Sequence, residues 1–176
     1  LKDKASSPER ILMAQTGRMR SAEHLNNNSE IILAASDLLL TSKLTPELKT
    51  EALYNRAKAY LAEGKQEVAM KDLIILGGDT RTIYGAEAKY LVAENLYKAK
   101  KYGAAEKEIL QFIEQSTPHA YWLARGFVLL SDVYVAMGKN LEARQYLLSL
   151  QQNYKADDDI ESMITTRLNK LKSENE

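Results

Sequence analysis

A pattern of small and bulky residues recurs along this chain at nearly constant intervals, 36 residues from Ala57 to Ala93 and 38 from Ala93 to Ser131. Each copy has a small residue, an aromatic or aliphatic residue three positions later and an alanine twelve positions later. The clearest copies are Ala57, Tyr60, Ala69; Ala93, Leu96, Ala105; and Ser131, Tyr134, Ala143. A fixed period of this size is typical of stacked helical hairpins. We interpret the small residues as points where the two helices of a hairpin cross closely, with the alanines facing them.

The composition favours helices over strands. Of the 176 residues, 45% are hydrophobic and 27% are charged, and only 3 are proline and 8 glycine, so helix-breaking residues are scarce. No segment alternates with the period of two that is typical of a strand. The formal net charge is zero, which argues against nucleic acid as a partner. The absence of cysteine excludes disulfides, thiolate catalysis and cysteine-bound zinc.

All three prolines follow a serine or threonine, as Ser7-Pro8, Thr45-Pro46 and Thr117-Pro118. A hydroxyl side chain at the N-cap with proline at the first helical position is a strong helix-start signal, because the hydroxyl accepts a free amide hydrogen bond. Pro46 lies 38 residues after Pro8, in agreement with the repeat. Pro118 comes slightly early in its repeat, so we expect its helix to begin about half a turn early. The hairpin without a proline is expected to open near Thr80 or Thr82.

These signals together predict eight helices in four hairpins, followed by a ninth helix. The expected helices are 7–25, 28–42, 46–63, 66–77, 81–100, 103–116, 118–137, 140–153 and 157–173. The corresponding repeats are 7–42, 46–77, 81–116 and 118–153, with a capping helix at 157–173. The turns are expected at Asn26-Asn27-Asn28, Gly64-Lys65, Lys101-Tyr102-Gly103 and Gly138-Lys139-Asn140, and residues 1–6 and 174–176 are expected to be disordered or tails.

The expected ninth helix has one apolar face, formed by Ile160, Met163, Ile164, Leu168 and Leu171. A stack of hairpins needs a terminal element with one polar side, so we predict that this helix is a cap. Asp157, Asp158 and Asp159 stand at its start, where carboxylates interact favourably with the positive end of the helix dipole. Calcium binding is the alternative for these aspartates, but the alternate spacing and the glycine of an EF-hand loop are missing.

The segment from Ala52 to Tyr60, followed by Gly64 and Ala69, resembles a tetratricopeptide repeat (TPR). The segment 131–134 with Gly138 and Ala143 resembles the same repeat, and 102–106 is similar to the start of its second helix. The resemblance covers most of residues 8–153. It implies an all-α fold, a right-handed superhelical stack of helix-turn-helix hairpins. The first copy departs from the pattern, because Met19, Ala22 and Ile31 stand at its small, aromatic and alanine positions.

Within this family, the copies from Glu87 to Leu150 most resemble large, uncharacterised repeat proteins of Bacteroidetes-type bacteria. They are more distantly similar to repeat lipoproteins of the bacterial outer membrane. The resemblance therefore favours a bacterial periplasm or cell envelope over the cytoplasm.

The resemblance also implies which side chains face a partner, because the first helices of TPR hairpins line a concave groove. Carried onto this sequence, the groove candidates are Arg20, Tyr54, Lys58, Glu87, Tyr90, Glu94, Tyr97, Arg125 and Asp132. Tyrosines among charges suit a recognition surface; the alternative is that the tyrosines only pack between neighbouring hairpins. The family's carboxylate clamp for chaperone tails is disfavoured, since Asn55 fits one of its positions but Tyr54, Tyr90 and Leu91 occupy others.

Support for catalysis is thin. The two histidines, His24 and His119, are nearly a hundred residues apart, and no metalloprotease motif, phosphate loop or nucleophile elbow occurs. Gly77-Gly78-Asp79 lacks the lysine and hydroxyl residue of a phosphate loop, so a helix stop and turn explain it better. We therefore expect no enzymatic activity, no cofactor and no metal.

The leading hypothesis is a non-enzymatic scaffold that binds a protein or peptide in the groove. One alternative is a structural spacer or self-association module at the C-terminal end of a longer solenoid, for which the first hairpin would expose an apolar side and homo-oligomers could form. Another is a component of an outer-membrane assembly or lipoprotein complex. Membrane insertion is not expected, because no apolar run approaches the roughly 20 residues that span a bilayer.

Overall fold

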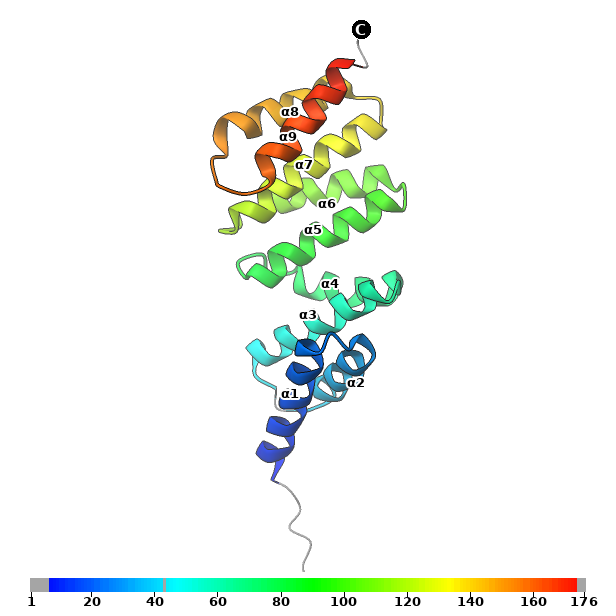
Figure 1. Ribbon diagram of the computed structural model, residues 1–176, viewed down its shortest axis with the longest axis vertical. Coiled ribbons are helices and arrows are strands. Elements are labelled where there is room, and N and C mark those ends of the chain that lie inside the picture. Colours follow the sequence, from blue (N-terminus) through cyan, green and yellow to red (C-terminus); the bar gives the residue numbers. More distant parts are fainter. Residues whose placement is uncertain (1–6, 43, 174–176) are drawn as a thin grey trace, which may run out of the picture. The chain divides into compact units, whose positions relative to one another are not determined.

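The computed structural model describes residues 7–42 and 44–173, and these residues form helices but no strand (Figure 1). The helices are α1 (Pro8–His24), α2 (Asn28–Leu39), α3 (Pro46–Ala62), α4 (Gln66–Leu76), α5 (Ile83–Lys98), α6 (Tyr102–Glu114), α7 (Ala120–Ala136), α8 (Asn140–Asn153) and α9 (Ile160–Ser173). The predicted all-α fold class is therefore confirmed. The tails expected at 1–6 and 174–176 lie outside the described residues.

The chain divides into two compact units, Leu1–Leu76 with helices α1 to α4 and Gly77–Glu176 with helices α5 to α9. In the first unit each helix packs against the next one along the chain. In the second unit α5 pairs with α6 and α7 pairs with α8, and α5 also packs against α7. Helix α9 packs against both α7 and α8. Each unit is thus a short stack of helical hairpins.

The small residues that define the repeat are buried, as predicted. Ala57, Ala93 and Ser131 are almost fully shielded from solvent, and so are the alanines expected to face them, Ala69, Ala105 and Ala143. The Ser131 hydroxyl donates to the carbonyl oxygen of Val128 at 2.6 Å within the same helix. This bond satisfies the buried polar atom, so serine serves here as a small residue.

The first hairpin accommodates a large residue at the small position. Met19 is fully buried and belongs to one apolar cluster with Ala34, Ala35 and Leu38 of α2 and Ala52 of α3. The alanines on the opposing helix leave the space that the long methionine side chain fills, because interiors tolerate exchanges that conserve volume.

Three of the expected helix starts are confirmed by hydroxyl caps. The side chain of Ser7 accepts from the Arg10 amide at 3.3 Å, that of Thr45 from the Leu48 amide at 3.3 Å, and that of Thr82 from the Gly85 amide at 3.0 Å. Each cap satisfies one amide that has no partner inside the helix. Of the two positions considered for the third start, Thr82 is the N-cap.

The prediction for the third proline was wrong. Helix α7 begins at Ala120 with His119 as N-cap, and not at Pro118. The Thr117 hydroxyl donates to the carbonyl oxygen of Thr80 at 2.6 Å and accepts from the His119 amide at 3.2 Å. Because this side chain ties the loop before α7 to the loop before α5, it does not cap the helix.

The hairpin turns use one residue in the left-handed region of backbone space. That residue is Asn26, Gly64 and Gly138 in three of the turns, but in the turn between α5 and α6 it is Lys100, with a φ of 59°. The expected turn at Lys101-Tyr102-Gly103 was therefore placed too late, since α6 already begins at Tyr102. Glycine adopts this conformation without strain, whereas a lysine does so at a cost of about 1 kcal/mol or more.

A buried ion pair holds α3 to α4 in the first unit. The Arg56 guanidinium donates two hydrogen bonds of 2.8 Å to the carboxylate of Asp72, and its third nitrogen donates to the Ser36 hydroxyl of α2 at 3.1 Å. The Asp72 side chain is only 5% exposed. A bidentate pair of this kind fixes the relative position of three helices.

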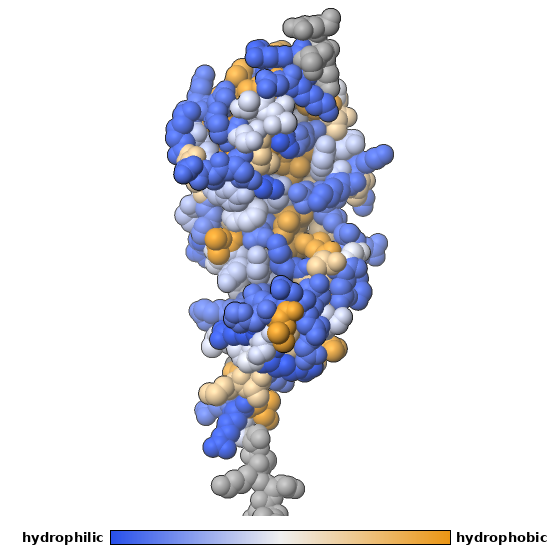
Figure 2. All heavy atoms as spheres, in the orientation of Figure 1, coloured by the Kyte–Doolittle hydropathy of each residue, from blue (hydrophilic) through white to orange (hydrophobic). Residues whose placement is uncertain are grey.

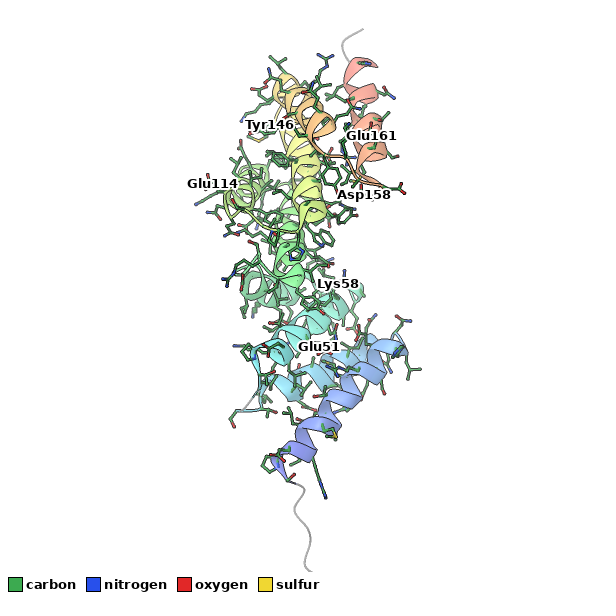
Figure 3. All side chains as sticks on the ribbon, turned by 90° about the vertical axis from the view of Figure 1, so that its left-hand side faces the viewer. Glu51, Lys58, Glu114, Tyr146, Asp158 and Glu161 are labelled. Carbon is green, nitrogen blue, oxygen red and sulfur yellow. The ribbon has the colours of Figure 1, made fainter. Side chains whose placement is uncertain are left out.

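Helix α9 caps the second unit, as predicted. Its residues Ile160, Ile164, Leu168 and Leu171 are buried in the same apolar cluster as the residues of α7 and α8. The cap begins three residues later than expected, because Asp158 accepts from the Ile160 amide at 3.0 Å and Asp159 occupies the N-cap position. Figure 3 shows Asp158 and Glu161 at this end of the helix.

The described residues contain no helix with both the length and the apolar character that crossing a lipid bilayer requires. In the view of Figure 2, hydrophilic residues cover most of the surface, and hydrophobic residues appear in separate patches.

Replacing Ala105 with leucine is expected to lower the free energy of unfolding by about 1–3 kcal/mol, because the larger side chain overpacks the α5–α6 crossing. Urea unfolding followed by the fluorescence of Trp122, the one tryptophan in the chain, measures this effect. The matched control is leucine at Ala104, which is exposed on the same helix. Equal stability of the two variants would contradict the assigned crossing.

Candidate interaction surface

Helices α5, α7 and α9 lie side by side and run parallel in the second unit. Arg125 of α7 donates a hydrogen bond to Tyr90 of α5. Nearer the C-terminal end of α7, Asp132 accepts a hydrogen bond from Arg167 of α9. Arg125 also bonds Asp159 at the N-cap of α9. The three helices run in the same direction, so their N-termini lie at one end of the unit and their C-termini at the other (Figure 1).

This surface has two parts, and the first is a hydrogen-bonded row of side chains centred on Arg125, which we call the Arg125 row. Its guanidinium donates to the hydroxyl of Tyr90 at 3.0 Å and to the hydroxyl of Tyr121 at 3.2 Å, and it lies 3.5 Å from the carboxylate of Asp159. The Tyr90 hydroxyl in turn donates to Glu94 at 3.0 Å. Three groups therefore hold the Arg125 side chain in one orientation.

Two aromatic rings lie beside the same arginine, and a third packs against both of them. The guanidinium carbon of Arg125 lies 5.0 Å from the centre of the Tyr90 ring and 5.9 Å from that of Tyr121, within the range of a cation–π interaction. Trp122 lies 5.5 Å from Tyr90 and 5.2 Å from Tyr121, centre to centre. Tyrosine, tryptophan and arginine are the residues that most often dominate binding energy at interfaces.

Burial raises the pKa of Tyr90 to about 12, and the negative charge of Glu94 adds to this effect against the opposing influence of Arg125. The unfolded chain releases this proton near pH 10, whereas the folded unit retains it up to about pH 12. Between these values the unfolded state binds fewer protons, so the free energy of unfolding falls as the pH rises.

We therefore expect the second unit to lose stability from about pH 10 to pH 12 and the Tyr90→Phe variant to lose less over the same interval. The stabilising contribution is fully present below pH 10. Urea unfolding followed by Trp122 fluorescence at successive pH values gives the slope of the free energy of unfolding against pH for each protein. Identical slopes for the wild type and the variant would contradict the burial of this hydroxyl.

The second part of this surface, nearer the C-terminal ends of the helices, is a pocket of about 170 Å³. It is lined by Tyr97, Ser131, Asp132, Val135, Ala136, Leu147, Arg167, Lys170 and Leu171. Arg167 donates two hydrogen bonds of 2.7 Å to Asp132 at its edge. Burial raises the pKa of Tyr97, and the nearby carboxylate of Asp132 raises it further. The pocket thus combines an apolar floor with a paired and positively charged edge.

The first unit has a separate polar surface where α1 meets α3. Arg20 donates two hydrogen bonds of 2.7 Å to Glu51, and the Asn55 amide donates to Glu23 at 3.3 Å. Figure 3 shows Glu51 and Lys58 on α3. Residues Arg20, Glu23 and Glu51 line a shallow depression with His24 and Asn26. Because its charged side chains bond one another, this depression offers less unpaired charge to a partner than the sequence suggests.

The structure places the groove candidates in four different settings. Tyr90, Glu94 and Arg125 form one bonded group, and Tyr97 and Asp132 line the pocket. Glu87 is only 9% exposed. In the first unit Arg20 pairs with Glu51, and the Lys58 ammonium lies 5.8 Å from the centre of the Tyr54 ring. Contact of any of these residues with a partner stays a prediction.

Sequence reasoning missed the partners that hold these candidates in place, namely Glu51, Trp122, Asp159 and Arg167. A signal for the last two exists in the chain. Arg125 follows Tyr90 by 35 residues, Asp159 follows Arg125 by 34, and Arg167 follows Asp132 by 35. Residues that can form a hydrogen bond or an ion pair and are about one repeat apart in the sequence come into contact, because they lie on neighbouring first helices.

No arrangement typical of catalysis occurs among the described residues. The His119 ring lies 3.0 Å from the carbonyl oxygen of Arg81 and participates in the loop before α7. No group of three histidine, aspartate or glutamate side chains in 7–42 and 44–173 is placed to hold a metal ion. The arrangement of rings and charges on α5, α7 and α9 is suited to binding.

No protein-family model and no curated protein matches the sequence. Among solved structures, the chain is similar to two crystal structures of a kinesin light chain-like protein from Podosopora anserina that has nearly identical TPR-like repeats, one of them a point variant. The point variant has 15% identity, a TM-score of 0.66, and coverage of 96% of this chain and 87% of the other. The second has 15% identity, a TM-score of 0.65, and coverage of 97% and 89%. This likeness shows a TPR-like helical repeat fold.

Proposed function

We propose that this chain is a non-enzymatic scaffold that binds a protein or peptide partner through the face formed by α5, α7 and α9. The observation that supports this most is the Arg125 row, in which Arg125 and the half-buried rings of Tyr121 and Trp122 are held in fixed positions beside the buried ring of Tyr90. Repeat folds with stacked hairpins typically bind other proteins along their first helices. Rigid aromatic and arginine side chains lose little entropy on binding, which favours tight contacts.

Photo-cross-linking tests this proposal. The aromatic cross-linker p-benzoylphenylalanine replaces Tyr97, which lines the pocket, or Gln111, which is exposed on α6. We expect one protein from the native host to cross-link from position 97 and not from position 111. Equal cross-linking from both positions, or none from either, would contradict the proposal.

A second candidate function, self-association through the first hairpin, is supported by exposed apolar side chains. Met13 is 75% exposed and Leu40 85% exposed, and Leu33 is also exposed. Leu40 is the C-cap residue of α2 and follows Leu33 by seven residues, so the two side chains lie on the same face of the hairpin. Sedimentation equilibrium of the wild type against Leu33→Ser/Leu40→Ser tests this candidate. A wild type that stays monomeric at high concentration would eliminate it.

A further inference from the structure

Lysines gather at the end of the second unit where α5, α7 and α9 finish. They are Lys98, Lys100, Lys101, Lys139, Lys170 and Lys172, which we call the basic end. Lys98 pairs with Glu94, and Lys139 lies 3.6 Å from Glu106. Lys100, Lys101 and Lys172 are exposed and form no ion pair with another described residue. Glu94, Glu106 and Glu142 lie near the same end, so the described lysines there outnumber the carboxylates and give a local positive charge in a chain whose formal net charge is zero.

Lys100 stands at a position where a lysine is unfavourable. Its φ of 59° lies in the left-handed region, where the equivalent turns of this chain have Asn26, Gly64 and Gly138. Glycine or asparagine would relieve the strain. Strained backbone positions occur preferentially at functional sites, so the lysine at this turn indicates a use for its charge.

The pocket described above opens at this same end. Its wall includes Tyr97, which directly precedes Lys98, and Ala136, which lies three residues before Lys139, and its edge includes Lys170. A volume of about 170 Å³ is close to that of an engineered apolar cavity that binds one benzene molecule. It therefore accommodates one apolar side chain, and its floor is apolar.

We propose that the basic end binds an acidic segment of a partner protein, which inserts one leucine-sized apolar side chain into this pocket. This proposal rests on the scaffold function proposed above and specifies the partner's chemistry. Positive charge attracts carboxylates at long range and accelerates association. The apolar pocket favours a protein segment over a polynucleotide, since burying a nucleobase would remove water from its polar edge, whereas an aliphatic side chain has no polar atom to desolvate.

The probe is a fluorescein-labelled nonapeptide with four glutamates on each side of one leucine, measured by fluorescence anisotropy with the full chain at low salt. We expect the dissociation constant to rise about tenfold in Lys100→Gln/Lys101→Gln, because these lysines contribute the charge. The control Lys49→Gln/Lys71→Gln removes the same charge from exposed positions in the first unit and is expected to leave binding unchanged. Raising the salt is expected to weaken binding.

Two further variants separate the pocket from the charge. Ala136→Leu, at an exposed position on the pocket wall, is expected to weaken the leucine peptide about tenfold but not a peptide with serine in its place, because it fills the apolar space. Lys100→Gly is expected to raise the melting temperature and yet weaken binding, since it removes strain and charge together.

Several results would overturn this inference: equal binding of the leucine and serine peptides, insensitivity to Lys100→Gln/Lys101→Gln, or tighter binding of single-stranded DNA or phosphatidylserine vesicles. Cross-linking distinguishes failure of this inference from failure of the scaffold function. If the partner cross-linked from position 97 is retained in Lys100→Gln/Lys101→Gln, only the acidic-segment inference fails. If no partner cross-links at all, the scaffold function fails with it.

Discussion

Replacing Phe112 with alanine is expected to lower the free energy of unfolding of the second unit by about 3–5 kcal/mol. Phe112 of α6 is 1% exposed and belongs to the large apolar cluster of this unit. Its ring packs against Gly126 of α7, where an added β-carbon would lie 3.4 Å from the ring. Removal of the ring leaves a cavity between two helices, because the glycine opposite has no side chain to fill it.

The chain contains its own control, since it has only two phenylalanines. Phe127 is half-buried, and its ring centre lies 6.1 Å from that of Tyr146. Phe127→Ala is expected to cost less than half as much, because part of its surface is already in contact with water. Urea unfolding followed by Trp122 fluorescence measures both variants in the same unit. Similar losses for the two would mean that the α6–α7 contact is not closely packed.

Replacing Arg56 with methionine is expected to destabilise the first unit by about 3 kcal/mol or more, because Asp72 is left as a buried carboxylate without its partner. The double variant Arg56→Met/Asp72→Leu is expected to recover most of this loss, since neither charge then remains. The reverse single change, Asp72→Leu, leaves a guanidinium that is 21% exposed, so it is expected to cost less.

Arg18 provides the matched control in the same unit. It pairs with Glu30 and Asp37 at the surface, and its side chain is 43% exposed. Arg18→Met is expected to leave the stability of the unit almost unchanged, as is usual for solvent-exposed ion pairs. Hydrogen exchange of the α3 amides reports on this unit, which has no tryptophan. A double variant no more stable than Arg56→Met would contradict the expected mechanism.

The helical fold was predictable because its determinants are local or periodic. Small residues at Ala57, Ala93 and Ser131 and hydroxyl caps at Ser7 and Thr45 act within one helix or one hairpin, and each is visible as a spacing in the sequence. The start of α7 was mispredicted because a tertiary hydrogen bond from Thr117 to Thr80 took the hydroxyl that the local signal assigned to a cap.

The candidate surface was only partly predictable for the same reason. The aromatic and charged residues of the first helices follow from the repeat, but the partners of those residues lie on other helices. That Arg125 bonds Tyr90 and Asp159, and that Asp132 bonds Arg167, depends on how far neighbouring helices are offset along their axes. This offset is set by side-chain packing, which one repeat read by itself does not reveal.

Helix α9 relates to α7 and α8 as α7 relates to α5 and α6, since it packs on both helices of the preceding hairpin. Its opposite side carries exposed polar residues such as Glu161, Thr165 and Asn169. It is thus half of one more hairpin, with a water-compatible exterior. This segment can therefore serve as a C-terminal cap in protein design. Fused to the end of a designed repeat array whose last hairpin has the α7–α8 sequence, it should prevent the aggregation that is expected of arrays without a cap.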